Sequence, residues 1–215
     1  MTSAIVVCGT DTGIGKTVVA AALCTLLDAD YWKPVQAGLD GETDRDTVIR
    51  LAQLNALHAH PEAYRLRTPA SPHRAAELDG IIIDTQNLAP PRTSNPLLIE
   101  LAGGLLVPLT REELQIDVVK RWAMPVVLVT STRLGTINHT LLSVSELRSR
   151  NIVIAGLVFT GDENKDTERT IADFTQLPVL GRLPKLDTLN AESLQNAARN
   201  CLDIAPILAA WGQTQ

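Results

Sequence analysis

A glycine-rich segment near the N-terminus carries the residue types that bind phosphate. Residues 9–17 read GTDTGIGKT, follow the apolar run 4–8 and open an alanine-rich segment. In such a strand, loop and helix, backbone N–H groups cradle phosphate, the lysine reaches the β and γ oxygens, and the next hydroxyl coordinates Mg²⁺. We therefore expect Lys16 and Thr17 to bind a nucleoside triphosphate together with magnesium. Thr10 stands where the general P-loop motif places its first glycine, which lies one residue earlier here.

Two acidic residues are candidates for further ligands of the metal, because Mg²⁺ prefers octahedral coordination by oxygen. Glu100 ends a predicted strand, at the edge where open α/β sheets bind ligands, and its apolar neighbours argue against a surface position. Asp46 lies in the segment 43–46 (TDRD), where charge at a helix N-terminus explains it equally well. Thr17, Glu100 and Asp46 are the predicted metal ligands, with both interpretations of Asp46 open.

Lys33 is an isolated cation inside the second apolar run, residues 31–35. A buried lysine is costly unless it is paired with an anion, and a strand beside the P-loop strand ends near the same phosphates. The alternative is an edge-strand lysine, since Pro34 removes a ladder donor. We favour the functional interpretation of Lys33.

The elements that position these residues follow from the apolar pattern. Apolar runs alternate with helical patterns, which predicts an α/β fold of P-loop NTPase type, a mostly parallel sheet with helices on both faces. The expected strands are residues 4–8, 31–35, 97–101, 125–129, 152–159 and 177–180. The expected helices are residues 16–27, 46–57, 111–122, 138–148 and 165–175, with a last one within 191–210. Thr110 and Glu113 form a predicted capping box for helix 111–122, and residues 61–96 are expected to be irregular with one short helix.

Composition limits the class of protein. The 215 residues are 45% hydrophobic and 20% charged, which predicts one folded domain over residues 1–215 and excludes wholesale disorder. The net charge of −5 lacks the basic excess that nucleic acid or anionic lipid requires.

The cysteines and the apolar runs indicate the compartment. Three separated cysteines form no disulfide framework or paired metal ligands, which favours a reducing cytosol. No run of 18 apolar residues occurs, and residues 1–4 do not resemble the start of a signal peptide. We therefore expect a cytoplasmic protein that is neither exported nor membrane-spanning.

Several motifs together resemble the dethiobiotin synthase family, ATP-dependent enzymes that close the ureido ring in biotin synthesis. They are residues 9–17, 31–38 (YWKPVQAG), 71–73 (SPH), 102–109 (AGGLLVPL) and 134–139 (LGTINH), in the family's order and along nearly the whole chain. The P-loop resembles the family's variant, including the additional residue after its first glycine. Leu101 stands where the family often has glycine, and Ala37 replaces a hydroxyl residue seen in some relatives. The segment Thr160-Gly161-Asp162 lacks the Asn-Asp pair that reads adenine in some members, which leaves the nucleotide base open.

The resemblance implies an ATP-dependent cyclo-ligase that forms C–N bonds. Its substrate is 7,8-diaminopelargonate, whose amine takes up CO₂ to form a carbamate. The carbamate oxygen attacks the γ-phosphate of ATP, and the second amine then closes the ring, which gives dethiobiotin, ADP and phosphate. Because phosphoryl transfer depends on positioning and cationic clamping, Lys16 and Lys33 are the expected catalytic residues. Lys33 would neutralise the carbamate and the transferring phosphoryl group.

The resemblance also implies the binding residues and a partner. The expected nucleotide-binding residues are Thr12, Gly13, Ile14, Gly15, Lys16, Thr17, Val18, Asp46, Glu100, Leu101, Ala102, Gly103, Thr160, Gly161, Pro184, Lys185 and Leu186. The expected substrate contacts are Lys33, Ala37, Gly135, Thr136, Ile137 and Asn138. In relatives the helix start at Asn138 is implied to bind the substrate carboxylate across a dimer interface, so we expect a homodimer with its active site near the interface. For His139 we prefer a capping role.

An ATP-driven switch of the partition (ParA) or septum-positioning (MinD) type is the alternative function, because it shares the P-loop architecture. Those switches usually carry a lysine at the position of Asp11, and their membrane-targeting members end in a basic amphipathic helix. Residues 201–215 contain no Lys or Arg. Both observations favour the synthase interpretation.

Overall fold

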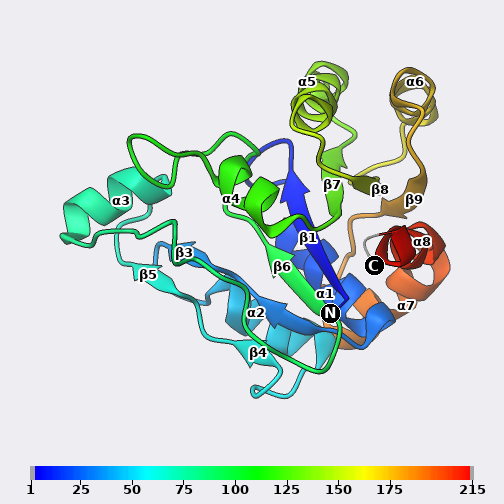
Figure 1. Cartoon of the computed structure of the whole chain (residues 1–215). Coiled ribbons are helices and arrows are strands. Elements are labelled where there is room, and N and C mark those ends of the chain that lie inside the picture. The colour runs from blue at the N-terminus through cyan, green and yellow to red at the C-terminus, as the bar shows by residue number, and fades with distance from the viewer. Residues whose placement is uncertain (1–2, 214–215) are drawn as a thin grey trace.

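The computed structural model describes residues 3–213 and centres on a seven-stranded parallel sheet (Figure 1). In spatial order the strands are β4 (Ala59–His60), β2 (Asp30–Trp32), β6 (Leu97–Glu100), β1 (Ala4–Gly9), β7 (Val126–Ser131), β8 (Ile154–Thr160) and β9 (Val179–Leu183). A separate parallel pair joins β3 (Val35–Ala37) to β5 (Tyr64–Leu66). Because every pairing is parallel, the carboxyl ends of the seven strands meet at one edge of the sheet.

Helices cover both faces of the sheet, which confirms the predicted fold class. The helices are α1 (Lys16–Leu27), α2 (Asp44–Ala52), α3 (Pro72–Asp79), α4 (Gln115–Trp122), α5 (Thr136–Ser149), α6 (Lys165–Thr175), α7 (Ala191–Cys201) and α8 (Ala205–Gln213). Apolar residues of α1, α2, α7 and α8 pack in one buried cluster, and those of α3 to α6 pack in the other. None of the helices in residues 3–213 is long and apolar enough to cross a membrane.

Strand β1 shows why both faces are covered. Ile5 and Val7 pack in the cluster on the α1 face, whereas Val6 and Cys8 pack in the cluster on the opposite face, and all four are fully buried. A strand buried on both sides reads as a continuous apolar run, because alternate side chains point to opposite faces. The sheet therefore lies at the centre of the core and presents its carboxyl edge to ligands.

The apolar run of residues 31–35 is two strands rather than one. β2 ends at Trp32, and β3 begins at Val35 and pairs with β5 outside the main sheet. Pro34 lacks the N–H group that a continuing ladder would need. Within residues 61–96 the predicted short helix is α3, whereas β5 was not expected.

Several helix limits also differ from the predicted ones, while α1 and α6 match theirs. Helix α4 begins at Gln115 rather than at residue 111. The Thr110 hydroxyl does accept a hydrogen bond from the N–H of Glu113 at 3.0 Å. This bond lies within a turn that is closed by an antiparallel bridge between Pro108 and Leu114, and it does not start the helix. The last predicted helix is two helices, α7 and α8, because Leu202 leaves the helical conformation and pairs with Gly181.

Helices α2 and α5 both begin two residues earlier than predicted, at Asp44 and Thr136. Thr43 caps α2 with its side chain, and α2 ends at Ala52 because Gln53 adopts a left-handed conformation with φ of 53°. Helix α5 starts directly after Gly135, which also has a positive φ, of 93°. Cap geometry thus decides both helix starts.

Candidate active site

The P-loop connects β1 to α1 at the centre of the carboxyl edge. Gly15 precedes α1 with φ of 92°, a conformation that favours glycine. The side chain of Lys16 is buried and its Nζ donates to the backbone oxygen of Asp11 at 2.7 Å. A Cβ at Gly9 would stand 2.8 Å from Cδ of Lys16. Gly9 therefore gives the lysine its room, which accounts for a glycine at position 9 in this variant loop.

Glu100 is where the predicted site residues converge. Its carboxylate is only 1% exposed. Oε1 accepts a hydrogen bond from the hydroxyl of Thr17 at 2.8 Å and one from Nζ of Lys33 at 3.3 Å. Three of the residues singled out by the sequence thus meet through one carboxylate, although they come from α1, the end of β2 and β6.

Lys33 is a buried ion-pair partner, 5% exposed, and not a solvated edge lysine. Its Nζ contacts Oδ2 of Asp44 on one side and Oε1 of Glu100 on the other. Burial alone would lower the pKa of Lys33, but the charges of Glu100 and Asp44 raise it above the ordinary value. The ammonium group therefore stays charged and lies between two carboxylates.

The structure does not bring Asp46 together with Lys33 and Glu100. Asp46 Oδ2 accepts from the hydroxyl of Thr43 at 2.7 Å and from its N–H at 3.3 Å, in a capping box at the start of α2. Asp44, two residues earlier, contacts Lys33 instead. The helix cap uses Asp46, and Asp44 of the same segment is the carboxylate that contacts Lys33.

A cavity of about 560 Å³ lies beside the P-loop, within the size range of small-molecule sites. Nine predicted nucleotide-binding residues line it: Gly13, Ile14, Gly15, Val18, Thr160, Gly161, Pro184, Lys185 and Leu186. The lining residues that sequence analysis missed are Ser131, Thr132, Arg133, Asp162, Leu183 and Leu189. They lie at or after the carboxyl ends of β7, β8 and β9, so the shared carboxyl edge is the signal that could have found them.

Two polar contacts shape this cavity. The hydroxyl of Thr160 donates to the backbone oxygen of Ile14 at 2.7 Å, which fixes the end of β8 against the P-loop. At the mouth, Nζ of Lys185 donates to Oδ2 of Asp162 at 2.7 Å, and both side chains are exposed. The part of the cavity lined by Asp162 and Lys185 therefore carries an exposed ion pair.

A second cavity, of about 420 Å³, lies on the other side of the P-loop. It is lined by Thr10, Asp11, Thr12, Gly104, Leu105, Leu106, Val107, His139, Leu142, Ser143 and Glu146. Thr12 thus faces this cavity rather than the larger one. Asn138 is exposed at the start of α5, while Thr136 is buried and its hydroxyl shares a 2.7 Å hydrogen bond with that of Thr130. None of the predicted substrate residues lines this cavity, although His139, the residue after Asn138, does.

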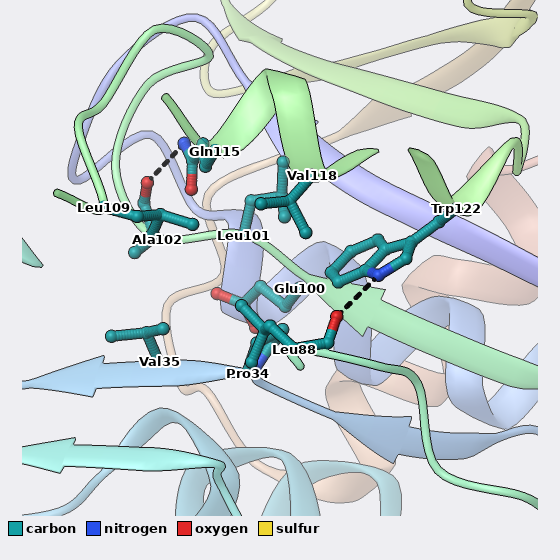
Figure 2. Close-up of a pocket in the computed structure, with 10 residues that line it drawn as sticks. All are labelled: Pro34, Val35, Leu88, Glu100, Leu101, Ala102, Leu109, Gln115, Val118 and Trp122. Atoms are coloured by element: carbon teal, nitrogen blue, oxygen red, sulfur yellow. Dashed lines mark hydrogen bonds between the residues drawn. The ribbon is translucent and has the colours of Figure 1, made fainter. Parts of the chain in front are cut away.

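Residues 101–103 follow Glu100 and separate the site from a small apolar pocket. Figure 2 shows that pocket, with Glu100 and Leu101 on one side and Trp122 on the other. Its volume of about 10 Å³ is room for a single water molecule. The backbone oxygen of Ala102 accepts a hydrogen bond of 2.8 Å from Gln115, and Leu101 packs in the core. Leu101 and Ala102 therefore line neither of the two large cavities. Gly103 does approach the P-loop, because a Cβ there would stand 3.2 Å from Oγ1 of Thr12.

The donor set around Glu100 fits Mg²⁺. The residues that meet there offer hydroxyl and carboxylate oxygens, which this hard cation prefers, and Mg²⁺ sites commonly use one or two carboxylates together with substrate phosphates. Across residues 3–213 no cluster of three or more His, Cys, Asp or Glu side chains could hold a metal ion by itself. A metal at this site would therefore be shared between the chain and bound phosphate.

Comparisons with known proteins give two sets of relatives. A family model described as an AAA domain matches residues 3–193. The ATP-dependent dethiobiotin synthetase BioD of Rhodopseudomonas palustris (strain HaA2) is 58% identical over 197 residues, 92% of either chain. The protein of that name from Agrobacterium fabrum is 54% identical over 203 residues, 94% of this chain and 96% of its own.

Solved structures resemble this chain more distantly. A putative plasmid partition protein of Borrelia burgdorferi bound to AMPPNP has a TM-score of 0.57 at 11% identity, over 100% of both chains. The septum site-determining protein MinD of Pyrococcus horikoshii, complexed with Mg-ADP, has a TM-score of 0.54 at 15% identity, over 93% of this chain and 96% of its own. At such identities the likeness shows a shared P-loop fold alone.

Proposed function

This chain belongs to the ATP-dependent dethiobiotin synthetases, and on that premise we propose that it carboxylates 7,8-diaminopelargonate with CO₂ and closes the ring at the expense of ATP. The products are dethiobiotin, ADP and phosphate. The observation that carries this proposal is the convergence of Thr17 and Lys33 on the buried carboxylate of Glu100, beside the P-loop. The arrangement supplies cationic and oxygen groups for phosphoryl transfer and needs no protein nucleophile.

The cavity of about 560 Å³ holds ATP in this proposal. The backbone N–H groups of residues 13–17 and the start of α1 bind the phosphates, because a helix N-terminus favours negative charge. Lys16 leaves the carbonyl of Asp11 to contact the β and γ oxygens. The cavity walls from β8 and β9 hold the base.

Thr17, Glu100 and Asp44 would hold Mg²⁺, and Asp44 takes the place that the sequence pattern gave to Asp46. When bound, Mg²⁺ neutralises charge on the β and γ phosphate oxygens. Thr17 and Glu100 already share a hydrogen bond of 2.8 Å, so the chain orients both oxygens before a ligand arrives. Asp46 keeps the start of α2, and thereby Asp44, in position.

In this proposal Lys33 neutralises charge on the carbamate and on the phosphoryl group that the carbamate receives from ATP. Phosphoryl transfer brings two anions together, the carbamate and the γ-phosphate of ATP. The charged ammonium of Lys33, held between Asp44 and Glu100, lowers the repulsion between these two reacting groups. The paired carboxylates keep Lys33 protonated, so it acts as an electrostatic group and not as a base.

We propose that diaminopelargonate binds across a homodimer interface, in the cavity of about 420 Å³ beside the P-loop. Leu106 and Leu142 line this cavity and are 50% and 62% exposed, and Leu134 before α5 is fully exposed. A second copy would cover this apolar face and bring the start of its α5 to the substrate carboxylate. Leu142→Glu should yield monomers in sedimentation, whereas Leu57→Glu, at an exposed leucine outside this cavity, should leave the dimer intact.

Residues 1–215 are proposed as one ligase domain, since the two buried clusters flank one sheet; residues 1–2 and 214–215 lie outside the described part. The proposal places the protein in the cytoplasm and gives it neither nucleic acid nor membrane as a partner, in line with its net charge of −5.

Product analysis tests the proposed reaction. The purified chain is incubated with diaminopelargonate, bicarbonate, Mg²⁺ and each nucleoside triphosphate in turn, and the products are identified by mass. We expect dethiobiotin with one nucleoside diphosphate per ring closed. Nucleotide hydrolysis that ignores diaminopelargonate would contradict the proposal and favour a switch ATPase.

A further inference from the structure

We infer that the buried hydroxyl of Tyr31 positions the Glu100 carboxylate for magnesium, an inference that rests on the proposed function. Tyr31 Oη donates a hydrogen bond of 2.8 Å to Oε2 of Glu100. The tyrosine is fully buried, so it acts through Glu100 and is a positioning residue rather than a catalytic one.

The sheet register explains how this contact forms. β2 and β6 are neighbours, with Tyr31 opposite Leu98. Alternate residues share a face, so Tyr31 and Lys33 point to the same side of β2 as Glu100 does on β6. The long phenol side chain carries its hydroxyl toward the carboxyl edge and Glu100. A shorter side chain at position 31 would instead end among the apolar residues of the α1 face.

The two oxygens of Glu100 have separate partners. Oε1 accepts from Thr17, at the start of α1, and from Lys33, whereas Oε2 accepts from the buried Tyr31. The carboxylate is 1% exposed, so bulk water does not replace a missing donor. Burial, followed by the charge of Glu100, raises the pKa of Tyr31 well above its ordinary value, and the phenol remains a donor. Tyr31 therefore anchors one oxygen of Glu100 and leaves the other toward the metal.

Substituting Tyr31→Phe removes the hydroxyl and keeps the ring. The chain has only two tyrosines, and Tyr64 supplies a matched control because its hydroxyl accepts the backbone N–H of Asp84 at 2.8 Å instead of donating to Glu100. Calorimetric titration of ADP at increasing Mg²⁺ concentrations measures the coupling between metal and nucleotide. We expect Y31F to raise the half-saturating Mg²⁺ concentration about tenfold or more, the usual cost of losing a partner behind a metal ligand.

The same titrations define the opposing result. ADP affinity without Mg²⁺ should be unchanged in Y31F, and Y64F should titrate like the parent. A folded Y31F whose half-saturating Mg²⁺ concentration stays within about threefold of the parent, against the tenfold scale above, would overturn the inference.

Glu100→Gln separates this inference from the proposed metal site. If E100Q keeps the Mg²⁺ dependence of the parent, the proposed metal site fails and the inference fails with it. If E100Q loses that dependence while Y31F keeps it, only the role of Tyr31 is wrong. In the E100Q background the further change Y31F should alter Mg²⁺ coupling little, since both changes remove one interaction.

A fluorine probe covers the case in which Y31F does not fold. Incorporating 3-fluorotyrosine into the Y64F chain labels Tyr31 alone, because no third tyrosine exists. The ¹⁹F resonance should shift when Mg²⁺ is added to the ADP-saturated protein. A resonance that ADP and Mg²⁺ together leave unmoved would overturn the inference.

Discussion

The ammonium group of Lys16 is hydrogen-bonded at 2.7 Å to the backbone carbonyl oxygen of Asp11, so its partner in the P-loop is a neutral dipole. Removing Lys16 therefore takes no hydrogen-bond or ion-pair partner away from a buried carboxylate. We expect Lys16→Ala to keep the fold, with a loss of about 1.5–3 kcal/mol for one hydrogen bond of a charged group, and to lower turnover by at least about 10²-fold. Circular dichroism and product assays measure the two effects, with Lys165→Ala, at an exposed lysine, as the control. Parent-like turnover in folded K16A would remove the P-loop lysine from the mechanism.

Lys33→Gln should have a double effect, because Lys33 is both a reacting-charge partner and the cation between two carboxylates. Single-turnover experiments with saturating ATP and diaminopelargonate should show the chemical step slowed about 10²–10³-fold, the scale for one preorganised electrostatic partner. ATP affinity should change little. Urea titration should show a loss of about 3–5 kcal/mol, as for breaking a buried ion pair.

The control for that prediction is Lys120→Gln, at an exposed lysine in the last turn of α4. It should match the parent in both experiments. A chemical step slowed less than about tenfold in K33Q, against that electrostatic scale, would leave Lys33 with a structural role only.

Asp44 and Asp46 provide a matched pair in one helical turn. Asp44→Asn should raise the Mg²⁺ concentration needed for half-maximal activity, because an amide lacks the charge that a hard cation favours. Asp46→Asn keeps an accepting oxygen at the start of α2 but loses the negative charge there, so it should cost about 0.3–1 kcal/mol of stability and leave the Mg²⁺ dependence near that of the parent. The opposite assignment of effects would restore Asp46 as the metal ligand.

Asp30 should make stability depend on acid pH. Burial raises its pKa, but hydrogen bonds from Thr93, Asn95, His58 and His60 together lower it below the ordinary value. A depressed pKa in the folded state stabilises the fold above the unfolded pKa of about 3.9 and loses that contribution as pH falls through the folded pKa. Asp30→Asn should be less stable by about 1.5–3 kcal/mol at pH 7, as for hydrogen bonds to a charged group.

Urea unfolding of D30N and parent at pH 7 and pH 3 measures this effect. The difference between the two proteins should narrow at the lower pH, where Asp30 of the parent begins to take up a proton. A difference that widens on acidification would show that the carboxylate does not have a depressed pKa.

The features that the sequence predicted well depend on residues that are close together in the chain. The parallel sheet, α1 and α6 followed from apolar spacing, and the P-loop residues Lys16 and Thr17 from a motif whose parts are adjacent in the chain. Glu100 and Lys33 are site candidates from the sequence because a charged residue inside an apolar run is unusual, and the structure buries both.

Other features depend on contacts that no local pattern contains. Tyr31 resembles an ordinary core aromatic until β2 and β6 become neighbours, because its partner Glu100 is 69 residues away. Asp44 and Asp46 differ only in which one the helix cap uses. The spacing from Thr43 to Asp46 matches a capping box and was the available signal. Strands β4 and β5 have two and three residues, too few for a period.

The position of β6 between β1 and β2 has a consequence for synthesis on the ribosome. β2 ends at Trp32 and β6 begins at Leu97, so the chain grows by about 65 residues before β6 can pair with β1 and β2, a delay of about 3–13 s at usual elongation rates. During that interval β1 and β2 emerge with apolar side chains and unpaired backbone edges. Nascent chains arrested before residue 97 should therefore depend on chaperones more than chains extended past β9, in which every strand of the sheet has its neighbours.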